Sequence, residues 1–217
     1  MLTVARVSSW LLVIVPLLVQ AVSSEDMNSQ RCARGLPPSA QANLRRSSAT
    51  ERAESSHPPT TYTGLLEVHD DESGNVLGFV SATDIFTREE GLRVSISTNN
   101  LCAPFDILAI NAEFSSPHYV GIAGGPLKHN SINTAAFTNV DQTAAGSVDG
   151  RQSAIWTMNP HSKALKAHLI NPDGSRPKTT LAYDARANAF FFVGDLEAYN
   201  DVFYYYIAGA VTLYLVD

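Results

Sequence analysis

Acidic side chains are the residues of this chain best suited to catalysis, because two carboxylates can act as an acid with a base or as an acid with a nucleophile. That chemistry requires a defined separation across a cleft, and the order of residues in a sequence does not give this separation. The candidates are Glu67, Glu113, Asp184, Asp195 and Glu197. No pair among them is singled out by spacing, so the catalytic residues are unknown from the sequence.

The six histidines stand at positions 57, 69, 118, 129, 161 and 168, and they form neither an H-E-x-x-H nor an H-x-H pattern. The acidic stretch HDDESGN, residues 69–75, has the oxygen ligands that calcium prefers but lacks the twelve-residue ligand spacing and the closing glutamate. We interpret it as a solvated turn, and we expect no metal site.

Two glycine-containing stretches could be confused with active-site loops. Ser147 lies in AAGSVDG, which is not the G-x-S-x-G pattern of a hydrolase nucleophile. The stretch GIAGGP, residues 121–126, lacks the lysine and the helix of a phosphate-binding loop. Both are typical of tight loops, and we expect no bound cofactor.

The stretch SAIWTMNPHSKALKAHLINPDGSRP, residues 153–177, combines an aromatic side chain with two histidines. Asn159, at which the strand ends, and Pro160 in the turn position predict a hairpin, and NPDG predicts a second turn. We interpret Trp156 as a core anchor, and His161 and His168 as surface residues that tolerate alanine. The competing hypothesis makes Trp156 a sugar-stacking platform with the histidines as its polar neighbours.

These residues belong to a chain of three parts. Residues 1–23 hold an apolar run, WLLVIVPLLV, followed by small residues, which predicts a signal peptide cleaved after Ala21 or Ser23. The run is too short for a membrane anchor. Residues 24–61 are rich in Ser, Ala, Arg and Pro, which predicts a disordered leader. Within it, Arg45-Arg46 is either a propeptide cleavage site or a chance dibasic pair.

Cys32 lies in the leader and Cys102 in the remainder of the chain. An oxidising secretory pathway would permit a disulfide between them, whereas a lone cysteine beside apolar residues is more often buried and inert. The sequence does not decide whether they pair.

Residues 62–217 carry short apolar segments with period two, bounded by Gly, Pro, Asn and Asp. Leu92, Val94 and Ile96 alternate in one of them. In the C-terminal run VFYYYIAGAVTLYLV, Val211, Leu213 and Leu215 should share one face, and we interpret the whole run as closing strands of the core. Eight to ten such strands predict a single all-β domain, an antiparallel sandwich or barrel.

Length and charge narrow the function classes. The chain has 217 residues and 45% hydrophobic residues, enough for one sizeable core. Residues 62–217 contain nine Lys and Arg against seventeen Asp and Glu, a formal charge of about −8. Nucleic acid and, after signal cleavage, membrane surfaces are therefore disfavoured as partners. The oligomeric state is not predicted.

The segments SAIWTMNP, ALKAHLINPDGSRP, TTLAYD and NAFFFVGD, with TGLLEVHD and NVLGFVS upstream, resemble a group of small secreted proteins of filamentous fungi, most of them uncharacterised. The resemblance covers residues 62–217 and rests mainly on Trp156, Asn171, Asp173, Gly174 and Asp195. It implies a secreted, extracellular β-rich protein and brings no catalytic residues.

Two functions stay open. The first is a noncatalytic binding or interaction domain with an extracellular ligand, a glycan or a protein, because loops on a rigid β framework usually carry recognition. The second is a secreted hydrolase with glycoside or acidic peptidase chemistry, suggested by the carboxylates and the dibasic pair. A surface-coating protein of the disulfide-rich kind is disfavoured, because the sequence contains only two cysteines.

Overall fold

The structure is a computed structural model that describes residues 58–81, 84–111, 116, 118–205 and 207–217. The predicted signal peptide, most of the predicted leader and Glu113 lie outside these residues. The first described strand begins at Thr60, two residues before the predicted start of the domain.

Strands make up nearly all of the regular structure in the described residues, with one short helix. In chain order the elements are β1 (Thr60–Asp70), β2 (Val76–Ser81), β3 (Asp84–Phe86), β4 (Arg93–Thr98), β5 (Ile107–Ala109), β6 (Tyr119–Gly124), β7 (Thr134–Val140), β8 (Arg151–Gln152), β9 (Trp156–Met158), β10 (Ala164–Ala167), β11 (Thr180–Asp184), β12 (Ala189–Val193), α2 (Leu196–Val202) and β13 (Ala208–Val216).

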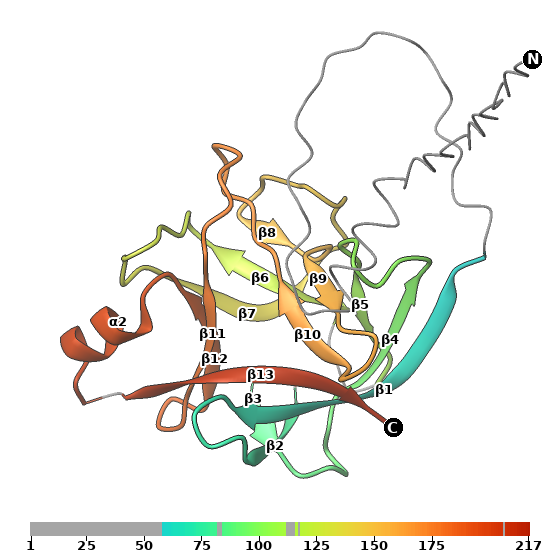
Figure 1. Cartoon of the computed structure of the whole chain (residues 1–217), viewed down its shortest axis with the longest axis horizontal. Coiled ribbons are helices and arrows are strands. Elements are labelled where there is room, and N and C mark those ends of the chain that lie inside the picture. The colour runs from blue at the N-terminus through green and yellow to red at the C-terminus, as the bar shows by residue number, and fades with distance from the viewer. Residues whose placement is uncertain (1–57, 82–83, 112–115, 117, 206) are drawn as a thin grey trace, which may run out of the picture.

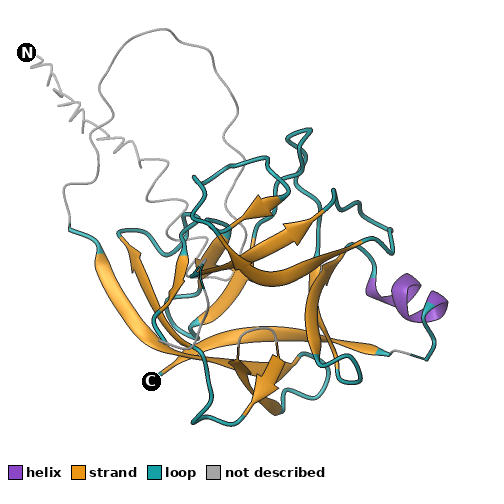
Figure 2. Cartoon of the chain, turned by 180° about the vertical axis from the view of Figure 1, so that it is seen from behind, coloured by secondary structure: helices purple, strands orange, loops and turns teal. Residues whose placement is uncertain are grey.

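Eight antiparallel strands close into a barrel (Figure 1). Their order is β1-β4-β5-β6-β7-β12-β11-β13, and β13 pairs back with β1 from Leu65↔Val216 to Asp70↔Val211. Strands β2 and β3 extend from β1, and β8 pairs with β6. Figure 2 shows the strands from behind, with the helix outside the ring. The predicted antiparallel all-β fold is confirmed, and a closed barrel is its form.

Alternation along the strands fills the barrel interior. Leu92, Val94 and Ile96 are at most 2% exposed, and Val211, Leu213 and Leu215 are all buried, so both predicted faces are confirmed. An eight-stranded barrel is just wide enough for side chains to fill it or to leave room for one small ligand.

The predicted hairpin of residues 153–177 is confirmed and lies against the barrel. Strands β9 and β10 pair through Lys166↔Thr157, and β10 pairs with β13. Strand β9 meets the segment before β5, where Phe105 and Trp156 exchange backbone hydrogen bonds. The NPDG stretch forms a turn in which the Gly174 N–H donates to the Asn171 carbonyl.

Strand β13 has two partners on the side away from β1. β11 pairs with residues 208–210 and β10 with residues 213–214. The two partner strands therefore diverge from neighbouring points of one strand, and the space between them is not closed by backbone pairing.

The C-terminal run is only partly strand, which corrects the prediction for its first half. Residues 208–216 form β13, but Val202, Phe203, Tyr204, Tyr205 and Ile207 are 41–73% exposed. The cause lies just upstream, where the Asp195 carboxylate accepts the Ala198 N–H and starts α2. No helix in the described part of the chain is long and apolar enough to cross a membrane.

Candidate functional site

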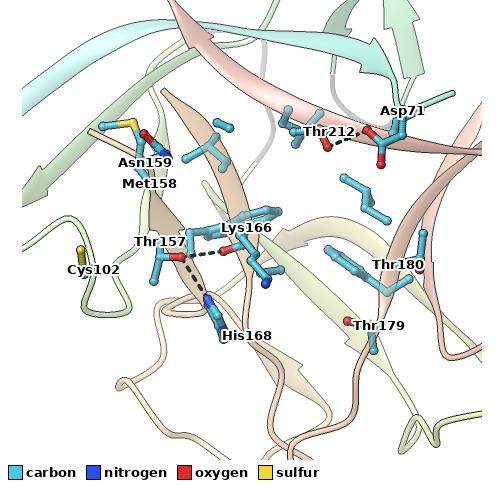
Figure 3. Close-up of a pocket in the computed structure, with 18 residues that line it drawn as sticks. Asp71, Cys102, Thr157, Met158, Asn159, Lys166, His168, Thr179, Thr180 and Thr212 are labelled. Atoms are coloured by element: carbon cyan, nitrogen blue, oxygen red, sulfur yellow. Dashed lines mark hydrogen bonds between the residues drawn. The ribbon is translucent and has the colours of Figure 1, made fainter. Parts of the chain in front are cut away.

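A pocket of about 400 Å³ lies between β10 and β11, where these strands diverge from β13 (Figure 3). Its floor is made of apolar side chains that also belong to the barrel core: Trp156, Leu165, Leu181, Phe192, Val211 and Leu213. A concave, mostly apolar pocket with a few polar groups at its rim is the usual form of a small-molecule site.

The polar groups of this pocket stand on two sides of it (Figure 3). On the hairpin side, the Thr157 hydroxyl lies 3.0 Å from His168 Nε2 and 3.4 Å from the Lys166 carbonyl oxygen. On the other side, the Thr212 hydroxyl donates to Asp71 at 2.7 Å. Lys166 and Asp71 therefore give the pocket a cationic side and an anionic side.

His168 is held in its neutral form. Burial lowers the pKa of the imidazole below its ordinary value of 6.5, and the positive charges of Lys166 and Arg176 lower it further. At neutral pH the ring thus offers one donor and one acceptor nitrogen to the pocket.

This shift predicts a stability that depends on pH. In the unfolded chain His168 takes up a proton near its ordinary pKa, while in the folded domain it resists protonation to lower pH. The unfolded state therefore binds more protons in that interval, so the contribution of His168 to stability is complete above about pH 6.5 and is lost as pH falls below it. Thermal melting at about pH 7.5 and pH 5.5 should show a smaller loss of stability in His168→Gln than in the wild type.

The exposed His161 provides the matched control. Its backbone N–H is bonded to the Asn159 side chain, but its own side chain is exposed, so His161→Gln should follow the wild type at both pH values. Equal pH dependence in the wild type and in His168→Gln would contradict the assignment of a neutral, buried His168.

One interpretation of this stretch needs correction, and another is confirmed. His168 is half-buried and lines the pocket, so the prediction of a surface histidine is wrong for it, although His161 is exposed as predicted. Trp156 is 1% exposed, and its Nε1 donates to the Val120 carbonyl oxygen at 2.9 Å. A ring so covered cannot serve as a sugar-stacking platform, and its role as a core anchor is confirmed.

Part of the pocket was predictable from the alternation of side chains along a strand. Lys166 lies in β10 and His168 directly follows this strand, so the two residues, two positions apart, point to the same side. Thr157 lies opposite Lys166 in the hairpin register. The facing wall, Thr179 to Leu181, comes from β11, and no local pattern brings it to the hairpin.

The carboxylates considered for catalysis serve other contacts. Glu67 bonds His69 at 2.7 Å on β1. Asp184 is buried and accepts the backbone N–H groups of Arg186 and Ala187 in the turn after β11. Asp195 caps α2, and Glu197 lies in the first turn of that helix. None of these four lines the pocket.

The other candidate residues also have structural surroundings. Asp70 accepts hydrogen bonds from Ser73 and closes the acidic turn, which lowers the pKa of its carboxyl. Ser147 bonds Asp149 within an exposed turn. Within the described ranges, no group of three or more His, Cys, Asp or Glu side chains is arranged to hold a metal ion.

Cys102 is half-buried and disulfide-bonded. The interpretation of an inert lone thiol is therefore wrong. Cys102 also lines the pocket, beside Met158 and Asn159. Cys32, the other cysteine of the sequence, lies outside the described residues.

Comparison with known proteins adds no family or activity to these observations. No family model matches the sequence, no curated protein matches it, and no solved structure matches the fold. The pocket and its residues are therefore the features that bear on function.

Proposed function

We propose that this chain is a secreted, noncatalytic binding protein whose barrel pocket holds a small, mainly apolar molecule with an anionic or hydrogen-bond-accepting head group. The observation that carries the proposal is the pocket between β10 and β11, in which an apolar floor meets a cationic and donor-bearing rim. Pockets of a few hundred Å³ with an apolar floor and a polar rim bind small ligands. The floor buries the apolar part of the ligand, and the rim orients its polar part.

The orientation of the ligand follows from the two sides of the pocket. Lys166, His168 and Thr157 supply donors at the hairpin side. Asp71 already accepts a hydrogen bond from Thr212 and would repel a negative charge. The head group therefore belongs beside Lys166, and the apolar body lies over Leu181 and Phe192.

The pair of Thr157 and His168 is not proposed as a nucleophile with its base. A histidine that removes a hydroxyl proton must become an imidazolium, which an acidic neighbour stabilises in hydrolases. Here the positive charges of Lys166 and Arg176 lower the pKa of His168 and so disfavour its imidazolium form. This is why the binding function is favoured over a hydrolase.

Two fluorescent probes of similar shape test the proposal. 1-Anilinonaphthalene-8-sulfonate carries an anionic head, and N-phenyl-1-naphthylamine carries none. We expect the folded protein to bind the sulfonate more tightly, and Lys166→Met to weaken the sulfonate about ten-fold while leaving the neutral probe unchanged, the size expected for one charge-assisted hydrogen bond. Lys178→Met, an exposed lysine outside the pocket, is the matched control.

A second variant separates the pocket from other apolar surface. Thr179→Trp places a large ring in the pocket from the segment just before β11, and it should abolish binding of both probes without lowering the melting temperature. Retention of both probes by this variant would reject the pocket as the binding site.

A further inference from the structure

A groove of about 600 Å³ lies on the outer face of the barrel and shares none of its described lining residues with the pocket between β10 and β11. We call it the outer groove; the end of β4, the segment before β5 and the loop after β7 form most of it. Ser95 and Ser97 of β4 alternate with core residues, so their side chains face outward. Ser95 pairs with Leu108 of β5, and Leu108 pairs with Tyr119 of β6, so these three side chains form one row across the outer face.

Hydrogen bonds fix the loop after β7 against the segment before β5. Asp106 accepts the Ser153 hydroxyl at 2.6 Å through Oδ1 and the Gln142 Nε2 group at 2.9 Å through Oδ2. Ser153 is fully buried, and its Oγ also accepts the Thr143 backbone N–H at 2.8 Å. This wall of the outer groove is therefore built before any ligand arrives, which lowers the entropy cost of binding.

The outer groove is polar but almost uncharged. Among the described residues that line it, Asp106 carries the one charged side chain. The other polar side chains are hydroxyls and amides, which both donate and accept hydrogen bonds: Ser95, Ser97, Thr98, Asn99, Tyr119, Gln142 and Thr143. A carboxylate accepts up to about four hydrogen bonds, so Asp106 can accept more than the two described here. This composition suits a neutral ligand with many hydroxyl groups and disfavours an anionic one.

We propose that the outer groove binds a neutral carbohydrate chain. Tyr119 supplies a half-buried aromatic ring, whose apolar face packs against the C–H face of a sugar ring. Sugar hydroxyls donate charge-assisted hydrogen bonds to Asp106 and exchange hydrogen bonds with Ser97 and Asn99. The short serine side chains leave room for the sugar over β4. This site goes beyond the proposed function of the pocket and does not rest on it.

An extended peptide fits the outer groove less well than a carbohydrate. β4 pairs with β1 and β5, β5 with β4 and β6, and β6 with β5 and β7. Each of the three strands beneath the groove thus has a partner on both sides, so a peptide cannot add a strand there.

Affinity electrophoresis of the full chain tests this site. Native gels should contain laminarin, galactomannan, arabinoxylan or hydroxyethyl cellulose, which are neutral polymers, or polygalacturonate, which is anionic. We expect at least one neutral polymer to retard the wild type, and polygalacturonate to leave its mobility unchanged. Tyr119→Ala should need about ten-fold more of the neutral polymer for the same retardation, because it removes the stacking ring.

Tyr214→Ala is the matched control for the loss of a tyrosine. Tyr214 is half-buried on β13, its ring contacts His69, and it lies outside the outer groove, so this variant should be retarded like the wild type. Ser97→Ile is a second variant, which fills the floor of the groove at an exposed position of β4. A β-branched residue suits a strand, so Ser97→Ile should keep the wild-type melting temperature and lose the retardation.

Absence of retardation by every neutral polymer, or retardation by polygalacturonate alone, would overturn the carbohydrate site. Retardation that persists in folded Ser97→Ile would overturn its location in the outer groove. Both groove variants should bind 1-anilinonaphthalene-8-sulfonate as the wild type does, so failure of this site and failure of the pocket are distinguishable.

Discussion

Trp156→Ala should lower the free energy of unfolding of the domain by about 3–5 kcal/mol, the range for truncating a fully buried large aromatic side chain. The ring packs edge-on against Phe137 and tilted against Phe192, with centroids 6.2 Å away in each case. Its Nε1 hydrogen bond to Val120 ties the β9–β10 hairpin to β6. The substitution removes all three contacts and leaves a cavity under the pocket.

Trp156→Phe is the matched variant, because it keeps an aromatic ring and removes the hydrogen bond to Val120. Its loss should be smaller, about 1–3 kcal/mol. Urea unfolding should be followed by far-ultraviolet circular dichroism, because both variants lose Trp156 as a fluorescent probe. The other tryptophan of the sequence, Trp10, lies in the predicted signal peptide. An unfolding midpoint of Trp156→Ala equal to that of the wild type would show that the hairpin does not depend on this anchor.

Gly121→Ala should lower the free energy of unfolding by about 1–3 kcal/mol, the usual range for an overpacked core. A Cβ at residue 121 would lie 2.2 Å from the Gln152 carbonyl oxygen and 2.5 Å from Val140 Cγ2. Gln152 is in β8, which pairs with β6 at this point, and its side chain also bonds the Ile170 backbone. The added methyl group therefore pushes β8 away from the barrel.

Gly125→Ala, four residues further along, controls for the loss of glycine flexibility. A Cβ at residue 125 meets nothing within 4 Å, so this variant should stay within about 0.5 kcal/mol of the wild type. Chemical denaturation of the two variants side by side measures the difference. Equal stabilities would mean that β8 moves away from Gly121 at no cost.

The strands were predictable because each one carries its pattern locally. Alternating apolar residues in β4 and β13 mark the inward face, and Asn159 with Pro160 marks the turn before β10. Barrel closure was not predictable in the same way, because it depends on β1 and β13 meeting, and these strands are separated by most of the domain.

The helix and the pocket were missed for different reasons. Asp195 was considered as a carboxylate for catalysis. An aspartate with a glutamate two residues later is also a typical start of a helix, but the aromatic residues that follow favoured a strand. The pocket joins His168 on the hairpin to Thr180 on β11, a pairing set by how two strands diverge from β13. Such an arrangement has no local signature in a sequence.

Closure by β1 and β13 also sets the order in which the domain can fold. The seam of the barrel joins the first and last described strands, so no complete ring exists until residues 208–216 have been synthesised and released from the ribosome. Until then the facing edges of β1 and β11 are without their β13 partner, and such edges can pair with other chains. Non-local strand pairing of this kind slows folding to milliseconds or seconds, so these two edges stay open to other chains until the last strand pairs with them.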